Sequence, residues 1–168
     1  VGSFSVQFHE VFNRLGSGDI KFGKITVDGE EVQLGHGTYS MLLQHPNQQV
    51  RKLAFETYYK GYVSVINTLA GLYEGSVRAD WFYAKAKKFG STMEKALFYE
   101  QVDRAVYVNL IKSTHASLAP LHEYIAFRKS QLGVETLNMY DLYLPIFENA
   151  DISCEYEEAC ELVLKGLA

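Results

Sequence analysis

The stretch from residue 46 to residue 89 constrains the fold more than any other part of this sequence, because its apolar side chains recur at helical spacing. No proline interrupts it after Pro46, and a continuous helix of this length would extend roughly 66 Å at about 1.5 Å per residue. One apolar stripe comprises Val50, Leu53, Ala54, Tyr58, Tyr62, Val65, Leu69 and Leu72. A second stripe beside it comprises Phe55, Tyr59, Ile66, Ala70, Tyr73, Val77 and Trp81. We therefore expect this helix to be packed on two sides.

The residues before the long helix predict a short helix and one β-hairpin. Residues 3–15 fit an amphipathic helix that stops at the glycines of residues 16–18. Residues 20–27 and 31–34 flank Asp28-Gly29, a dipeptide that supplies the positive φ angles of a tight hairpin turn. A lone hairpin is only marginally stable in water, so it needs helices to pack against.

Capping residues and glycines predict where helices begin and bend in this half of the chain. Thr38 can cap a short helix through Leu43. Pro46 suits the first turn of the long helix, because its missing N–H would be unpaired there anyway. A glycine inside a helix costs about 1 kcal/mol relative to Ala, which predicts either close helix-to-helix approach or a break near Gly75. The glycines concerned are Gly61, Gly71 and Gly75.

Three more helices are predicted after Gly90, which ends the long helix. Ser91 and Glu94 form the pattern of a capping box for a helix through Phe98.

Asp103 caps the next predicted helix, which stops at Gly133 and is expected to kink at Pro120. Residues 135–150 lack helical order, and residues 155–167 predict a last helix. The chain is thus predicted to be mainly α, with long antiparallel helices packed as a bundle.

One small β-hairpin near residues 20–34 is the only β structure that we expect. Apolar residues make up 48% of the chain and charged residues 21%, a composition typical of soluble globular proteins. No apolar run approaches the roughly 20 residues of a membrane span.

Charge is distributed unevenly along the chain. Residues 46–89 carry seven Lys or Arg against three Asp or Glu, whereas residues 135–168 carry one against eight. This asymmetry suggests that the two segments face each other. A pI of about 5.7 argues against nucleic acid as a partner, because nucleic acid usually demands a basic surface.

The two cysteines, Cys154 and Cys160, fall in or beside the last predicted helix and point in different directions. They do not make a disulfide framework, and a reduced, cytoplasmic setting is the natural interpretation.

Two sites begin like the zinc-protease signature, in which histidines four residues apart bind the metal and the intervening Glu polarises water. His9 and His122 are each followed by Glu, but the second histidine is replaced by Asn13 in one case and by Ala126 in the other. His115 and His122 lie about 10 Å apart along one predicted helix, too far to share an ion easily. We interpret all of these as ordinary histidines.

Other chemical signatures are also incomplete or missing in the sequence. The acidic residues of the last helix divide between its faces and match the helix dipole at its start. The 12 tyrosines could form a stacking surface, but at helical spacing they are more typical of a core whose hydroxyls reach partners. There is no G-x-S-x-G elbow, Gly-rich phosphate loop or Cys-x-x-Cys pair. No catalytic or metal-binding residue is therefore predicted, and no substrate-binding residue can be named.

Several sequence blocks, in the same order, resemble oligoendopeptidase F of the M3 family of zinc metallopeptidases over roughly residues 20–168. The most specific block is the run from Met139 to Pro145. The other blocks are Val50-Arg51, Ala54-Phe55, Tyr59, Asn67 to Ala70, Tyr83-Ala84-Lys85, Phe89, Ser91, Ala96-Leu97-Phe98, Arg128-Lys129, Leu132-Gly133 and Tyr156 to Ala159. The sequence departs from the family pattern at Lys87, Phe89 and Asn138, the last of which stands where a His often precedes the Met-Tyr-Asp block.

This resemblance implies a segment of a cytoplasmic enzyme that hydrolyses short peptides. The family's zinc is held by a His-Glu-x-x-His helix and a downstream Glu, which would lie beyond Ala168, so we expect this chain alone to bind no zinc and to be inactive. The resemblance places residues 1–98 at the end of an N-terminal helical domain. Residues 99–168 would then be the opening helices of a truncated catalytic domain, whose remainder is a partner. In this interpretation the chain shapes the wall of a substrate channel.

A different class of function is also compatible with the residues. The chain could be a free-standing, non-catalytic helical module that binds a protein partner through its tyrosine-rich surface. The two hypotheses differ in whether the source gene continues after Ala168.

Overall fold

The computed structural model describes residues 4–146 and 155–167. These residues are mainly helical and include one two-stranded antiparallel sheet, which confirms the predicted fold class. In chain order the elements are α1 (Phe4–Arg14), the π-helical turn η1 (Leu15–Asp19), β1 (Lys24–Val27), β2 (Glu30–Gln33), α2 (His36–Leu42), α3 (Gln48–Ser64), α4 (Ile66–Ala86), α5 (Thr92–Glu100), α6 (Arg104–Ala116), α7 (Leu118–Gln131), the 3-10 turn η2 (Met139–Asp141) and α8 (Tyr156–Leu167).

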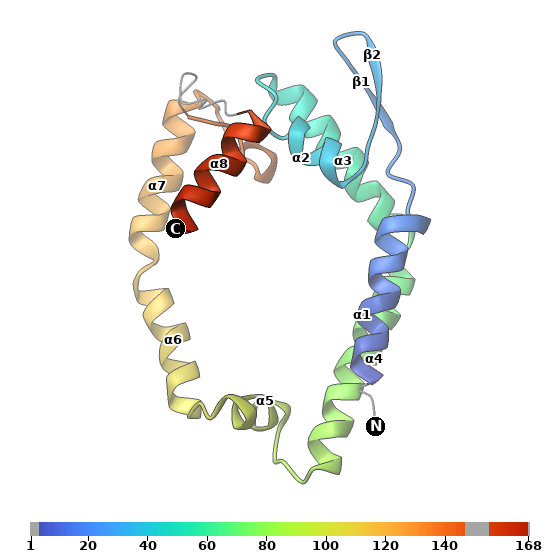
Figure 1. Cartoon of the computed structure of the whole chain (residues 1–168), viewed down its shortest axis with the longest axis vertical. Helices are drawn as coiled ribbons and strands as arrows, with labels where there is room; N and C mark the ends of the chain where they lie inside the picture. The colour runs from blue at the N-terminus through green and yellow to red at the C-terminus, as the bar shows by residue number, and fades with distance from the viewer. Residues whose placement is uncertain (1–3, 147–154, 168) are drawn as a thin grey trace.

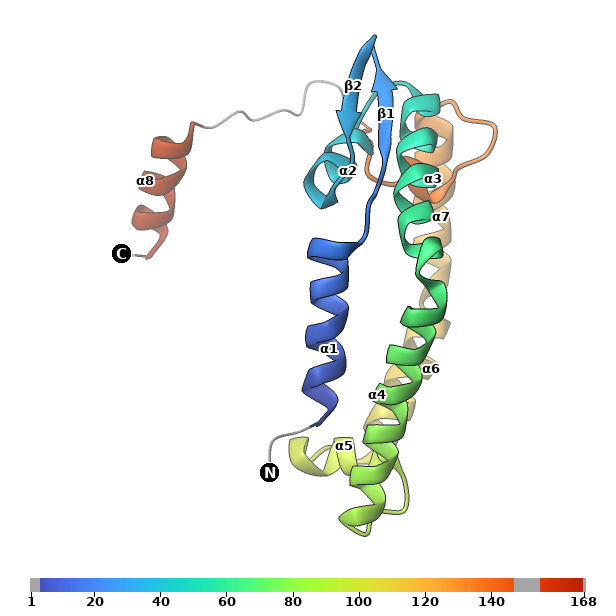
Figure 2. The same cartoon turned by 90° about the vertical axis from the view of Figure 1, so that its right-hand side faces the viewer.

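The helices are arranged as a frame with two long sides (Figure 1). Helices α3 and α4 form one side, and α6 and α7 return along the other, so the long helices are antiparallel as predicted. Helix α5 joins the two sides at one end, while the η2 turn lies between α3 and α7 at the other. Helix α1 runs antiparallel to α4 and packs along it (Figure 2).

The apolar core lies where the hairpin and α2 pack against α3. Its buried members are Ile20, Phe22, Ile25, Leu34, Leu42, Ala54 and Tyr58. A Cβ atom at Gly61 of α3 would lie 2.9 Å from Ile20 Cγ2 and 3.0 Å from Phe22 Cδ1. The absence of a side chain at Gly61 therefore lets the segment that leads into β1 approach α3 closely. The sequence predicted close approach at this glycine, but of another helix.

The hairpin forms where the sequence places it. Its turn joins Val27 to Glu30, which are paired across the two strands. Asp28 and Gly29 have φ angles of 51° and 88°, the two positive values that a tight two-residue hairpin turn requires. The predicted turn is confirmed.

The single long helix predicted from residue 46 to residue 89 is wrong: it is two helices with a break at Val65, and the second helix ends at Ala86, before the predicted end at Gly90. Val65 has φ −118° and ψ 21°, outside the helical region. The Ser64 hydroxyl donates to the carbonyl of Gly61 at 2.6 Å, and the Val65 N–H bonds to Tyr62 instead. Because a serine side chain competes for backbone hydrogen bonds in this way, the break falls at Val65 and not near Gly75.

Two predicted helix starts are also shifted. Helix α3 begins at Gln48, after Pro46, and Asn47 caps it: the Asn47 side chain accepts a hydrogen bond from the backbone N–H of Gln49 at 2.9 Å. Helix α2 begins after Gly35, and Thr38 lies in its first turn. The Thr38 hydroxyl accepts a hydrogen bond from the Gly35 N–H at 2.8 Å, so it still satisfies an end group of the helix.

The kink expected at Pro120 is a full break three residues earlier, at Ser117, which has φ −102° and ψ 15°. A proline ring clashes with the carbonyl four residues before it and offers that carbonyl no N–H. For Pro120 that carbonyl belongs to Ala116, the last residue of α6. The second of these helices, α7, ends just before Gly133, which confirms the predicted stop, and Gly133 has a φ of 61°.

The caps predicted from the sequence in the second half are present. The Ser91 hydroxyl accepts from the Glu94 N–H at 3.0 Å, and the Glu94 carboxylate accepts from the Gly90 N–H at 2.8 Å. Asp103 accepts from the Ala105 N–H at 2.6 Å. These side chains fix the starts of α5 and α6.

One face of the α3–α4 side is packed and the other is exposed. A Cβ atom at Gly75 would overlap the Phe8 ring, which shows how closely α1 approaches α4. On α4 the second apolar stripe is largely exposed: Tyr73 is 74% exposed and Trp81 is 59% exposed. Within the part of the chain that the structure describes, the packing on two sides that we expected from the two stripes is not provided along α4.

None of the helices in the described ranges combines the length and the apolar character needed to cross a membrane. Cys160 is an exposed free thiol, whereas Cys154 lies outside the described residues.

Candidate functional site

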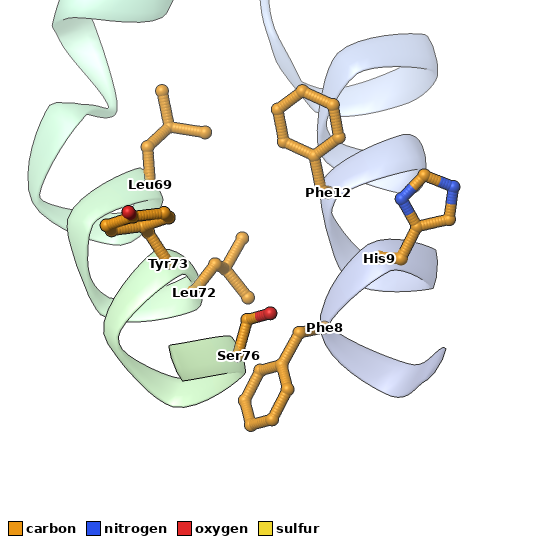
Figure 3. A pocket seen from close by; sticks show the side chains of 7 residues that line it. All are labelled: Phe8, His9, Phe12, Leu69, Leu72, Tyr73 and Ser76. Atoms are coloured by element: carbon orange, nitrogen blue, oxygen red, sulfur yellow. The ribbon is translucent and has the colours of Figure 1, made fainter. Parts of the chain in front are cut away.

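The first candidate is a groove between α1 and α4 with a volume of about 370 Å³. It is lined by Phe8, His9, Phe12, Leu69, Leu72, Tyr73 and Ser76 (Figure 3). Most of these side chains are apolar, because the two helices meet here through their apolar stripes. The groove is therefore shaped for an apolar side chain and offers few polar groups.

The polar groups of this groove do not form a catalytic arrangement. In Figure 3 the imidazole of His9 points away from Ser76, which projects from the facing helix. A histidine activates a serine only within hydrogen-bond reach. His9 is therefore not placed to activate Ser76 as a nucleophile.

Zinc, which the resemblance implies for the intact enzyme, does not fit the side chains present. Within residues 4–146 and 155–167, no group of three or more His, Cys, Asp and Glu is close enough to hold a metal ion. A zinc centre needs three or four such ligands. His9, His115 and His122 belong to no such group among the described residues.

The second candidate is a buried ionic cluster that the sequence motifs did not reveal. We call it the clasp, and it consists of Arg51 of α3, Arg128 of α7 and Asp141 of η2. Asp141 is 0% exposed, Arg51 1% and Arg128 7%. Charged side chains are almost never buried to this extent unless they are paired.

Arg51 holds Asp141 from one side of the frame. Its Nη2 and Nε atoms lie 2.7 and 3.1 Å from Asp141 Oδ1, and its Nη1 donates to the carbonyls of His45 and Pro46. The Gln48 amide donates to Asp141 Oδ2 at 3.1 Å. Burial alone would raise the pKa of Asp141, but the hydrogen bonds from the Asn138 N–H, Arg51 and Gln48 outweigh it and lower the pKa.

Arg128 holds the same turn from the other side of the frame. Its Nη2 donates to the carbonyls of Leu144 at 2.7 Å and Asp141 at 3.3 Å. Its Nη1 donates to the Tyr124 hydroxyl at 3.2 Å. Among the described residues, Arg128 Nε is a buried donor without a hydrogen-bond partner, an arrangement that costs about 1–3 kcal/mol.

One sequence signal did point toward the clasp. The basic segment 46–89 and the acidic segment 135–168 were expected to face each other, and Arg51 and Asp141 bring these two segments together. Asn138, one of the departures from the family pattern, keeps local hydrogen bonds: its side chain donates to the Thr136 carbonyl at 3.1 Å. Its backbone N–H donates to Asp141 at 2.9 Å. Charge counting indicated the segments but could not identify the pair.

A third cluster is aromatic and centres on Tyr58. The Tyr58 ring stacks on Tyr39 with centroids 4.0 Å apart and on Phe22 with centroids 4.5 Å apart. Its hydroxyl lies 2.6 Å from His36 Nδ1. Burial is the largest cause that raises the pKa of Tyr39 to about 12 and also raises the pKa of Tyr58. Tyr58 is thus a core residue with a paired hydroxyl, as the helical spacing predicted. The prediction is wrong for other tyrosines, since Tyr73 and Tyr143 are exposed.

Comparison with known proteins places the chain in a family. The sequence model of peptidase family M3 matches residues 41–165. This match covers most of the chain and includes both sides of the frame and all three residues of the clasp. The chain therefore belongs to peptidase family M3.

Its relatives are oligoendopeptidases of the F type. The chain is 42% identical over 158 residues to oligopeptidase PepF of Bacillus subtilis, covering 94% of this chain and 24% of that protein. It is 35% identical over 160 residues to an oligoendopeptidase F homolog of Borreliella burgdorferi, covering 95% and 26%. The crystal structure of oligoendopeptidase-F from Enterococcus faecium superimposes with a TM-score of 0.81 at 33% identity, covering 99% of this chain and 32% of that one.

The chain spans about a quarter of the length of these curated relatives. Over the region that the chain covers, its helical fold is shared with the Enterococcus faecium structure.

Proposed function

We propose that this chain is a segment of a cytoplasmic zinc metallopeptidase that hydrolyses short peptides. In this proposal the segment forms a helical wall of the substrate channel, and other parts of the polypeptide supply the zinc centre that activates water. The short peptides and the remainder of the catalytic domain are its partners. The family match over residues 41–165 supports the class of enzyme.

The amount of exposed surface carries the proposal. A compact monomer of 19.0 kDa exposes about 8,400 Å², whereas this chain exposes 13028 Å². The excess includes large apolar side chains on α4, among them Tyr73, Val77 and Trp81. A surface of this size and character is what a segment shows when the elements that cover it in a larger protein are not present.

The proposal divides the chain as the resemblance implied. Residues 1–98, with the hairpin and the α3–α4 side, would complete an N-terminal helical domain. Residues 99–168 would open the catalytic domain. The chain reverses direction at α5 (Figure 1), which is consistent with a division near residue 98.

A chimera tests the scaffold role directly. This chain would replace the matched segment of oligopeptidase PepF from Bacillus subtilis, and cleavage of a quenched fluorescent peptide would be measured. We expect the chimera to remain active. Trp81→Asp should abolish folding or activity of the chimera, because it places a charge on the face to be covered, whereas Arg78→Asp at an exposed polar site should not. A folded chimera without activity would contradict the proposal.

The isolated chain provides the second test. We expect it neither to bind stoichiometric zinc nor to cleave the same peptide, and one tightly held zinc per chain would count against the proposal. The alternative, a free-standing helical binding module, predicts a source gene that terminates after Ala168. Reading that gene distinguishes the two.

A further inference from the structure

The turn at residues 138–144 is held by polar contacts from both sides of the frame. Arg51 reaches it from α3 and Arg128 reaches it from α7. Met139 and Tyr143 within the turn are mostly exposed, and the Tyr140 ring contacts Phe55 of α3 edge-on, with centroids 5.8 Å apart. In the described ranges, the contacts that reach this turn from both sides of the frame are the directional hydrogen bonds that the buried guanidinium groups of Arg51 and Arg128 donate to it.

The clasp stands apart from the apolar core. The core packs the hairpin and α2 against α3 through Ile25, Leu34 and Tyr58, and none of the three clasp residues belongs to it. In the described ranges α3 has extensive contacts with α2, with β1 and with the η2 turn. The contacts with η2 connect α3 to the chain that continues from α7.

Because the clasp residues are charged and buried, we expect their contacts to form or break together. The Arg51 guanidinium pairs with the Asp141 carboxylate. The Arg128 guanidinium donates to the backbone carbonyls of Asp141 and Leu144, in the turn that the Asp141 carboxylate fixes. Removing one member of such a buried set leaves the others with unpaired charge or donors. The turn then loses its hold on both helices together.

We propose that the clasp is a conformational device that locks α3 to α7 and so closes the frame at the end opposite α5. With the clasp intact the two sides keep one relative position. With the clasp broken, the α2–α3 and hairpin unit and the α6–α7 unit each stay folded, and the distance between them is no longer fixed. This inference does not rest on the proposed function, since it concerns only contacts within the chain.

Spin-label distance measurements on the full chain test the lock. Both native cysteines are replaced by Ser. One label pair at Lys60 and Glu123 reports the distance between the two sides, and a second pair at Glu30 and Lys60 reports the fold of the hairpin on α3. All three label sites are exposed.

The variants are Asp141→Asn and Arg128→Met, with Glu31→Gln as the matched control. Glu31 forms an exposed ion pair with Lys24, so its substitution removes a pair without touching the clasp. We expect one narrow 60–123 distance in the parent and in Glu31→Gln. In both clasp variants the distribution of the 60–123 distance should broaden, whereas the distribution of the 30–60 distance should stay unchanged.

Two results would overturn the inference. A 60–123 distance that stays narrow in both clasp variants would show that other contacts hold the frame. Loss of the 30–60 distance in both clasp variants would show that the cluster maintains the whole fold and not the relation between its two sides.

Discussion

Arg51 Nη2 lies 2.7 Å from Asp141 Oδ1, and the two residues are 90 positions apart in the chain. Both side chains are fully buried. A long-range pair of this kind fixes chain topology at a cost, because desolvation of both charges must be offset by their attraction and by further hydrogen bonds. Gln48 and the Asn138 N–H provide those bonds.

Asp141→Asn should lower the free energy that opens the 138–144 turn by about 3–5 kcal/mol, because Arg51 is left with an uncompensated buried charge. Hydrogen exchange of the turn amides measures this opening free energy. The hairpin amides serve as an internal control and should keep their protection. The double variant Arg51→Met/Asp141→Leu should recover part of the loss, since an apolar pair removes both charges together. Equal losses in the single and double variants would argue against a paired cluster.

Acid should release the same turn. The pKa of Asp141 is lowered by its hydrogen bonds, so its contribution to stability is present above the unfolded value of about 3.9. That contribution is lost as the pH falls through the lower folded value. Exchange of the turn amides should therefore approach that of Asp141→Asn in acid, and the difference between the two proteins should be largest near neutral pH. A difference that persists unchanged below the folded pKa would be inconsistent with this linkage.

Gly61→Ala and Gly71→Ala should change stability in opposite directions although both lie inside helices. A Cβ atom at Gly61 meets Ile20, Phe22 and the backbone of Lys21, whereas nothing lies within 4 Å of one at Gly71. We expect Gly61→Ala to cost about 1–3 kcal/mol through overpacking and Gly71→Ala to gain up to about 1 kcal/mol from helix propensity. Urea denaturation followed by far-ultraviolet circular dichroism measures both. If Gly61→Ala raised the free energy of unfolding, the residues that pack against Gly61 would be able to move away from α3 at little cost.

Alkaline pH should weaken the aromatic cluster. The pKa of Tyr39 is raised to about 12 and that of Tyr58 is also raised, so the neutral forms are favoured in the folded state. The associated stability is present below the unfolded tyrosine value of about 10 and is lost as the pH rises above it. Tyrosinate absorbance, followed during an alkaline titration, should show that some tyrosines ionise only when the chain unfolds. Tyr58→Phe should remove part of that late ionisation, whereas Tyr73→Phe, at a side chain that is 74% exposed, should not.

The sequence by itself determined the elements whose hydrogen bonds close within a few residues. Asp28-Gly29 specifies the hairpin turn, Ser91 and Asp103 specify two helix starts, and Gly133 specifies a helix end. Each of these signals is local, because a cap or a turn satisfies backbone groups of its immediate neighbours. The helical periodicity and the family resemblance were reliable for the same reason, since both are read directly along the chain.

Only the tertiary structure decided which distant residues meet and which apolar faces are covered. Periodicity could not show that the long helix breaks at Val65, where a serine hydroxyl takes a backbone carbonyl. It could not pair Arg51 with Asp141, because charge counts identify segments and not partners. Nor could it show that the stripe through Tyr73 and Trp81 stays exposed, since an apolar stripe indicates that a face is suited to burial and does not supply the element that buries it.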